Sequence, residues 1–150
     1  MAGIVDTNIL LYAANRDAAE HTVAREFLLR VGTGPDQWYL TEGILYEFLR
    51  VATHPKVFAQ PLTWQEAIEF IRRLVDNPRF RVLAAGEQHW SLLGELLAHL
   101  THPSGNLFFD IRTAVLMREH GVREIYTSDV DFLQFPGLKA INPMQNDARR

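Results

Sequence analysis

Apolar residues along this chain alternate between short continuous runs and longer stretches in which they recur every three or four residues. Short runs predict buried strands, whereas the longer period predicts helices with one apolar face. The pattern predicts strands over residues 2–5, 38–40, 80–83, 124–127 and 138–141. It predicts helices over residues 8–14, 17–31, 41–53, 63–76, 87–100 and 107–120.

Local signals define several helix ends. Thr63 followed by Glu66 is a capping box, which favours a helix start. Asp17 followed by Glu20 resembles the same signal, and Gly32 is typical of the residue after a helix. We therefore expect the second helix to span residues 17–31.

Strands that alternate with helices predict an α/β/α sandwich with a short, mostly parallel five-stranded sheet. No repeat, charge block or linker divides the 150 residues, so we expect one domain over residues 1–142 and a polar tail over residues 143–150. The chain has no cysteine, which excludes a disulfide framework and favours a reducing compartment. Without a spanning segment or secretory signal, we expect a cytoplasmic protein with no membrane partner.

Four carboxylates stand in unusually apolar surroundings. Asp6 and Asp129 each end a short apolar run, Asp110 follows Leu-Phe-Phe, and Glu47 lies within an apolar helical pattern. Ligands of parallel α/β folds bind beyond the carboxyl ends of strands, where Asp6 and Asp129 lie. The helices that carry Asp110 and Glu47 both begin at that edge, so we expect all four acids to converge there.

Such a cluster would repel itself unless it bound a cation, and no Lys or Arg adjoins Asp6 or Asp129 in sequence. Mg²⁺ or Mn²⁺ suits carboxylate oxygens, so we predict a metal site. Asp131 could replace or join Asp129 as a ligand. Short polar side chains at the same edge would orient carboxylates or water: Thr7, Asn8, Thr127 and Ser128.

Each acid also has an ordinary structural interpretation. Asp6 could cap the following helix, Asp110 could be favoured by its helix dipole, and Asp129 could be a turn residue. Glu47 could form an ion pair with a buried arginine, such as Arg50 or Arg112.

Residues 4–12, Ile-Val-Asp-Thr-Asn-Ile-Leu-Leu-Tyr, resemble the start of a PIN domain. Residues 106–110, Asn-Leu-Phe-Phe-Asp, and 127–132, Thr-Ser-Asp-Val-Asp-Phe, continue the resemblance, specifically to VapC-type toxins of bacterial toxin–antitoxin pairs. It implies an acidic quartet of Asp6, Glu47, Asp110 and Asp129. It also implies a Mg²⁺- or Mn²⁺-dependent endoribonuclease, a homodimer, and a VapB-type antitoxin that blocks the site.

The resulting hypothesis is metal-assisted hydrolysis of phosphodiester bonds in single-stranded or structured RNA. The net charge is −3, but thirteen of the fifteen basic residues are Arg. Arginine binds phosphate well, and Arg16, Arg50 and Arg112 are candidates to hold the RNA backbone. GC-rich codon usage would produce the same bias.

Two alternatives remain open. An aspartyl-phosphate phosphotransfer domain would use Asp6 as nucleophile and Lys139 as its cation, although no second acid lies two residues after Asp6. A catalytically silent, partner-binding PIN-like module would keep the fold without the chemistry. A dinucleotide site is excluded because no glycine-rich turn follows the first strand.

Overall fold

A computed structural model describes residues 2–145 and contains a five-stranded sheet in which every neighbouring pair of strands is parallel. The spatial order is β3-β2-β1-β4-β5. The strands are β1 (Ile4–Val5), β2 (Trp38–Thr41), β3 (Phe80–Leu83), β4 (Glu124–Tyr126) and β5 (Lys139–Ile141). The predicted α/β class and short parallel sheet are confirmed.

Six α-helices and one 3₁₀ helix connect the strands within the described part of the chain. The first four are α1 (Thr7–Ala14), α2 (His21–Thr33), α3 (Glu42–Ala52) and α4 (Trp64–Val75). The others are α5 (His89–Leu97), α6 (Leu107–Glu119) and the 3₁₀ helix η1 (Val130–Gln134). None of the helices in residues 2–145 is both long and apolar enough to cross a bilayer.

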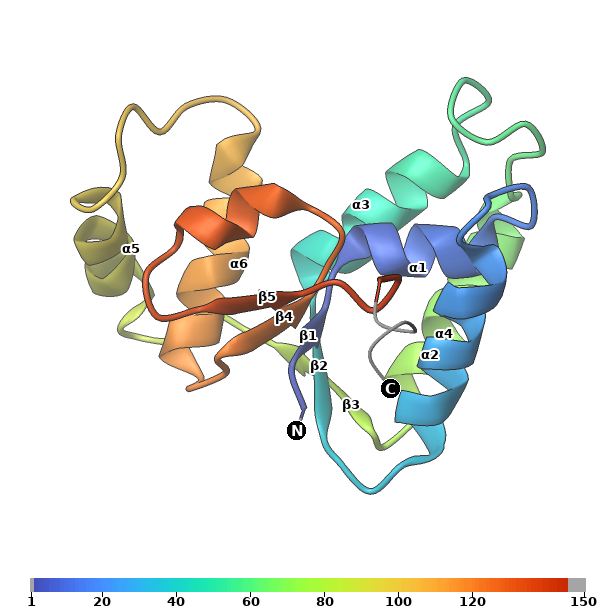
Figure 1. The fold of residues 1–150 in the computed structure, drawn as a ribbon, viewed down its shortest axis with the longest axis horizontal. Helices are drawn as coiled ribbons and strands as arrows, with labels where there is room; N and C mark the ends of the chain where they lie inside the picture. The colour runs from blue at the N-terminus through green and yellow to red at the C-terminus, as the bar shows by residue number, and fades with distance from the viewer. Residues whose placement is uncertain (1, 146–150) are drawn as a thin grey trace.

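The strand order explains how the helices are distributed. From β1 the chain moves outward to β2 and β3, then returns past β1 to add β4 and β5. Because parallel crossovers are right-handed, reversing the direction of travel moves the connecting helices to the opposite face. Figure 1 shows α1, α2, α3 and α4 on one side of the sheet and α5 and α6 on the other. The reversal lies between β1 and β4, where such folds bind ligands.

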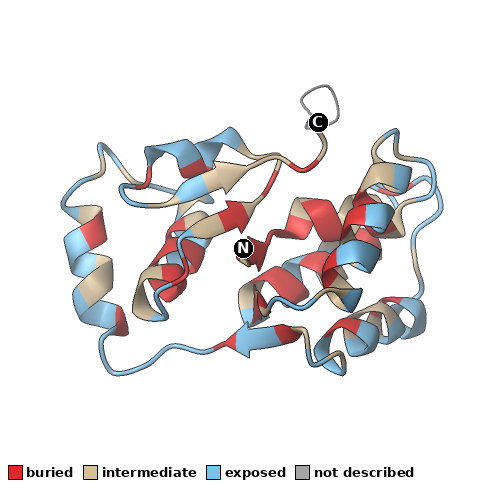
Figure 2. Ribbon diagram, turned by 60° about the horizontal axis from the view of Figure 1, so that its bottom comes forward, coloured by how far each residue is buried: buried red, intermediate tan, exposed pale blue. Residues whose placement is uncertain are grey.

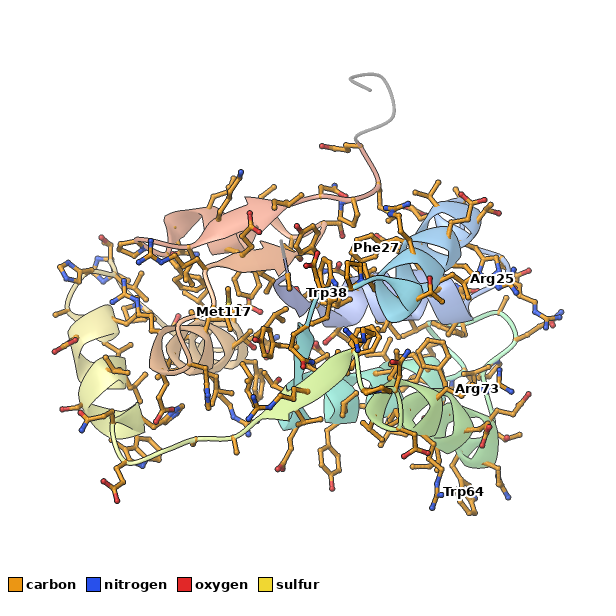
Figure 3. The ribbon with its side chains drawn as sticks, turned by 90° about the horizontal axis from the view of Figure 1, so that it is seen from below. Arg25, Phe27, Trp38, Trp64, Arg73 and Met117 are labelled. Atoms are coloured by element: carbon orange, nitrogen blue, oxygen red, sulfur yellow. The ribbon has the colours of Figure 1, made fainter. Side chains whose placement is uncertain are left out.

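The core is densest around β1 and α6. Both residues of β1 are fully buried, and α6 buries every residue from Ile111 to Met117 except Arg112. Figure 2 shows this contrast, with α6 largely buried and α5 mostly intermediate or exposed. Phe27 of α2 meets Trp38 of β2 edge-on, with ring centroids 5.6 Å apart, and both side chains lie in the interior in Figure 3. Aromatic packing thus fixes α2 on the sheet.

The local end signals are partly confirmed. At Thr63 the hydroxyl accepts from the Glu66 amide at 3.1 Å, and the Glu66 carboxylate accepts from the Thr63 amide at 2.9 Å. The predicted start of the second helix at Asp17 is wrong, because α2 begins at His21. Asn15 accepts from the Asp17 amide at 3.1 Å, so its side chain forms a turn that competes with the cap.

The end of α2 and the limits of α5 also differ from prediction. Gly32 lies inside α2, which continues to Thr33 and has Gly34 as its C-cap. The helix predicted over residues 87–100 is shorter, since α5 covers His89–Leu97 and the next residues form tighter turns. The predicted boundary at residue 142 stays a prediction. Pro143 is buried, Met144 packs against the core, and residues 146–150 of the predicted tail lie outside the described residues.

Candidate functional site

All four predicted acids line one cavity of about 350 Å³ at the carboxyl edge of the sheet. We call it the acidic pocket, and α1, α3, α6 and the segment after β4 form its walls. Its acidic lining is Asp6, Glu47, Asp110, Asp129 and Asp131. The topology that brings strand ends and helix starts to one edge therefore brings these side chains together.

Asp6 is both a helix cap and a wall of the acidic pocket. Its Oδ1 accepts from the Thr7 amide at 2.8 Å at the start of α1, and its Oδ2 accepts from the Thr127 hydroxyl at 2.8 Å. Only 7% of the residue is exposed. Burial raises the pKa of Asp6 to about 6, although the hydrogen bonds from Thr127 and Thr7 oppose the rise. Asp6 therefore caps α1 and also lines the acidic pocket, so the capping interpretation does not exclude a role in the site.

Asp110, Asp129 and Asp131 form the tightest group of carboxylates. One carboxylate oxygen from each lies within 4.8 Å of the other two. Asp129 caps η1 by accepting from the Asp131 amide at 2.9 Å, and Asp131 itself is exposed at the rim of the acidic pocket. Burial, followed by the charges of Asp6 and Asp129, raises the pKa of Asp110 to about 7.

Glu47 occupies a different position from the other acids. It is exposed on α3, where it lines the open acidic pocket and does not pack into the core. Among residues 2–145 no ion pair joins it to Arg50 or Arg112, so the proposed structural pairing is not observed. Its charge contributes to the raised pKa values of Asp6 and Asp110.

A hydrogen-bonded network connects Asp6 and Asp129 to neighbouring polar residues. The Thr127 hydroxyl donates to Asp6, and accepts from the Asn8 amide group at 3.0 Å and the Asp129 amide at 2.9 Å. The Asn8 carbonyl oxygen accepts from the Ser128 amide at 3.1 Å. These bonds join the end of β1 to the residues that follow β4, and Ser128 takes part through its backbone amide.

Replacing Thr127 with Val should test this support. Valine keeps the shape but removes the hydroxyl, leaving one Asp6 oxygen and the Asp129 amide without that partner. We expect the variant to lose about 1–3 kcal/mol of unfolding free energy and to bind Mn²⁺ more weakly. Chemical denaturation and calorimetry would measure the two effects. Thr53→Val, which loses one hydroxyl bond to its own helix at 2.7 Å, is the control; equal effects would contradict the supporting role.

The three arginines predicted to hold RNA are not equivalent. Arg50 lines the acidic pocket and Arg112 lines a second cavity beside it, whereas Arg16 lines neither. The charge of Arg16 instead contributes to lowering the pKa of Glu66, at the start of α4.

The second cavity, about 250 Å³, lies between α3 and α6, and we call it the aromatic pocket. It shares five residues with the acidic pocket: Asp6, Glu47, Arg50, Phe109 and Asp110. Its aromatic side chains, Tyr46 and Phe109, were not predicted as site residues. Their signal in the sequence is weak: each directly precedes a predicted acid.

The residues of the acidic pocket fit a divalent cation. They offer hard carboxylate oxygens, and three of these lie close enough together to share one ion. In residues 2–145 no Lys or Arg pairs with these acids. Burial is the main cause of the raised pKa values of Asp6 and Asp110, and the neighbouring carboxylates raise both further. A bound divalent cation would compensate the negative charge of these carboxylates.

Comparison with known proteins agrees with this geometry. A family model for the PIN domain matches residues 3–138. Ribonuclease VapC48 of Mycobacterium tuberculosis is 31% identical over 143 residues, covering 95% of this chain and 98% of that protein. Ribonuclease VapC33 of the same organism is 34% identical over 142 residues, with 95% and 98% covered.

Solved structures show the same fold at lower identity. The sarcin-ricin loop cleaving toxin VapC20 of M. tuberculosis superposes with a TM-score of 0.66 at 18% identity, covering 93% of this chain and 99% of that one. The VapBC-1 structure from nontypeable Haemophilus influenzae gives a TM-score of 0.67 at 20% identity, with 97% and 100% covered.

Proposed function

The chain belongs to the PIN-domain family, and from this premise we propose that it is a metal-dependent endoribonuclease that acts as the toxin of a type II toxin–antitoxin pair. Its curated relatives are VapC ribonucleases of matching length. The observation that carries the proposal is the convergence of Asp6, Glu47, Asp110 and Asp129 in one pocket. A family fold alone would not require four acids there.

We assign the metal-ligand role to Asp6, Asp110 and Asp129, and the closeness of Asp131 to Asp110 and Asp129 supports it as a further ligand. Asp6 is fixed by Thr127 and Thr7, so its carboxylate is oriented before any ligand arrives. Glu47 approaches from α3 and binds the ion directly or through water. A bound Mg²⁺ or Mn²⁺ would neutralise charge on the phosphodiester and make water more acidic.

The pocket residues would then direct hydrolysis. The oxygen of water would form a bond to phosphorus and give up a proton to a pocket carboxylate or to solvent. The bond from phosphorus to the leaving ribose oxygen would break, and that oxygen would take up a proton. The carboxylates would orient the water and, through the cation that they would hold, the phosphate, so that the attacking and leaving oxygens lie in line. Arg50, at the same pocket, contributes positive charge toward the substrate backbone.

We further propose a VapB-type antitoxin as partner. This is supported by structural neighbours that are toxin–antitoxin complexes, including VapBC from Salmonella typhimurium bound to DNA. A homodimer and a cytoplasmic location stay predictions from the sequence. The antitoxin would have to cover the acidic pocket to silence the enzyme.

The aspartyl-phosphate alternative has less support. Lys139 begins β5, pairs in register with Glu124 at the start of β4, and lines neither pocket. Both oxygens of Asp6 already accept hydrogen bonds, which disfavours a nucleophilic role. The silent-module alternative predicts intact folding and partner binding without cleavage.

Cleavage of total cellular RNA by the purified protein tests the proposal. We expect discrete fragments with Mg²⁺ or Mn²⁺, and none with EDTA or with Asp129→Asn. An exposed acid outside the pockets, Asp76, supplies the matched control, and Asp76→Asn should cleave normally. Metal binding by calorimetry without cleavage of any RNA supplied would favour the silent module.

A further inference from the structure

We propose that the aromatic pocket binds one unpaired nucleotide next to the scissile phosphate, with its base stacked on Tyr46 and Phe109 and its phosphates held by Arg50 and Arg112. This inference rests on the proposed ribonuclease function and deepens it, because it names single-stranded RNA with an unstacked base as the substrate at this position.

The first observation is the exposure of two aromatic rings. Tyr46 on α3 is 71% exposed and Phe109 on α6 is 68% exposed, yet both line the same cavity. Large aromatic side chains normally bury most of their surface. Two such rings facing one pocket offer apolar faces on which a base can stack, a contact worth about 1–3 kcal/mol per base.

The second observation is that each helix pairs its aromatic residue with an arginine on the same face. Arg50 follows Tyr46 by four residues on α3, and Arg112 follows Phe109 by three on α6. Residues at these spacings are neighbours on a helix surface. Among residues 2–145 neither arginine forms an ion pair, so both charges are available to a polyanion.

The position of Arg112 depends on Gly43. A Cβ at Gly43 would lie 2.7 Å from Nη1 of Arg112, so the guanidinium rests directly against the backbone of α3. The glycine thereby lets Arg112 of α6 reach across to α3, where it closes one wall of the aromatic pocket. Alanine at this position would displace the guanidinium without requiring any movement of the backbone.

The third observation is continuity with the acidic pocket. Asp6, Glu47 and Asp110 line both cavities, so a nucleotide in the aromatic pocket adjoins the metal-ligating carboxylates. A base inside an A-form duplex is stacked and its major-groove edge is inaccessible to side chains. A cavity of about 250 Å³ between two helices therefore suits a base that has left the stack.

A peptide segment of a protein partner is the competing occupant, because the apolar rings would also accept apolar side chains. The lining also includes Asp6, Glu47 and Asp110, whose charge the proposed cation would offset. The two arginines beside the rings then favour RNA, because a chain with one phosphate per nucleotide would place negative charge beside each. The same arginines would give an apolar peptide no advantage.

Binding of a fluorescein-labelled single-stranded RNA of about 12 nucleotides tests the proposal. We would use Asp129→Asn as the non-cleaving background, because Asp129 lines only the acidic pocket. We expect Tyr46→Ala and Phe109→Ala each to weaken RNA binding on the order of tenfold. The conservative variants Tyr46→Phe and Phe109→Tyr should bind the RNA as the background protein does. The same RNA annealed to its complement should bind more weakly than the single strand and be insensitive to these changes.

Control variants lie outside both pockets. Trp64 is 66% exposed on α4 and Arg25 is exposed on α2, and Figure 3 shows both at the periphery. Trp64→Ala and Arg25→Ala should bind the RNA as the background protein does. Thermal melts of every variant would confirm that the fold is kept.

Salt dependence tests the arginines separately. Arg50→Ala and Arg112→Ala should each reduce the slope of log Kd against log salt by about 0.7, the value for one phosphate contact with a single strand. Gly43→Ala should reproduce the Arg112→Ala slope while keeping or raising the melting temperature, since Gly43 lies in the first turn of α3 and alanine has a higher helix propensity than glycine. An unchanged slope in Arg112→Ala would overturn the phosphate role.

The outcomes separate this inference from the proposed function. If the wild-type protein cleaves RNA and both alanine variants bind and cleave normally, the aromatic pocket does not bind RNA and the proposed function stands. If those variants lose only the binding of a protein partner, the pocket is a peptide site and the inference is wrong. If the wild-type protein cleaves no RNA, the proposed function itself fails.

Discussion

Replacing Asp110 with Asn should abolish RNA cleavage and, at the same time, raise the melting temperature of the metal-free protein at pH 8. Asparagine keeps the shape of the side chain and removes its charge. In the wild type that charge lies among other carboxylates, and burial with the charges of Asp6 and Asp129 raises the pKa of Asp110 to about 7. Ionised at pH 8, Asp110 therefore opposes folding, and its neutral replacement should relieve that cost.

The expected loss of activity exceeds the roughly 10–100-fold typical of residues that only support metal ligands. The expected gain in melting temperature is a few degrees, about 2–8 °C, because Asp110 is only half-buried and solvent screens part of the repulsion. Cleavage assays in Mn²⁺ and melts in EDTA would measure the two effects together.

Asp76→Asn is again the matched control, since Asp76 is an exposed acid at the end of α4. It should leave both cleavage and melting temperature unchanged. A lower melting temperature for Asp110→Asn would instead identify Asp110 as a structural acid that favours the start of α6, the interpretation that the helix dipole offers.

The positions of Asp6 and Asp129 could be predicted because Asp6 directly follows β1 and Asp129 lies three residues after the end of β4. In a parallel sheet every strand ends at the same edge, so two residues far apart in sequence meet there without knowledge of any side chain. Predicting the position of Asp110 also required the direction of the helix that precedes β4. These inferences depend on chain direction alone, and hydrophobic pattern is enough to supply it.

Glu47 shows what the pattern cannot resolve. Its apolar helical neighbours predict a core-facing side chain, but the structure places it at an open cavity, exposed to solvent. Hydrophobic periodicity identifies the inner face of a helix and does not distinguish a packed interior from the wall of a pocket. The sequence left open whether Asp131 replaces or joins Asp129. Its closeness to Asp110 and Asp129 depends on the local turn that Asp129 caps, which the hydrophobic pattern does not define.

The aromatic pocket lay beyond sequence reasoning because two separate helices build it. Tyr46 and Arg50 come from α3, whereas Phe109 and Arg112 come from α6, and the strand order that places these helices together cannot be read from either segment. The predicted start of the second helix at Asp17 was wrong for a local reason. The side chain of Asn15 accepts from the Asp17 amide, which makes a turn where a capping box was expected.

Metal binding should reverse the pH dependence that the acidic pocket gives to the fold. Without metal, Asp6 and Asp110 have pKa values of about 6 and about 7, raised from an ordinary value of 3.8. Between about pH 4 and pH 7 the unfolded chain therefore loses these protons before the folded protein does. The two groups then destabilise the fold as pH rises through this window and have no further effect above it.

A divalent cation requires the ionised carboxylates, so protons compete with it. We expect the rise in melting temperature caused by saturating Mn²⁺ to be large at pH 8 and small at pH 5.5. The logarithm of the Kd should increase as pH falls below 7, with a slope that approaches 2 below pH 6 if both acids must ionise. Melts and calorimetry across this range, with EDTA as reference, would measure both quantities.

The variant Asp6→Asn with Asp110→Asn provides the internal control. This variant lacks both carboxyl groups whose pKa is raised, so it should lose the pH-dependent part of metal-free stability that they contribute. Mn²⁺ should stabilise it little at either pH. If Mn²⁺ instead raised the melting temperature of the wild type equally at pH 5.5 and pH 8, the ion would be binding acids of ordinary pKa elsewhere. Asp6 and Asp110 would then lie beside a metal site without belonging to it.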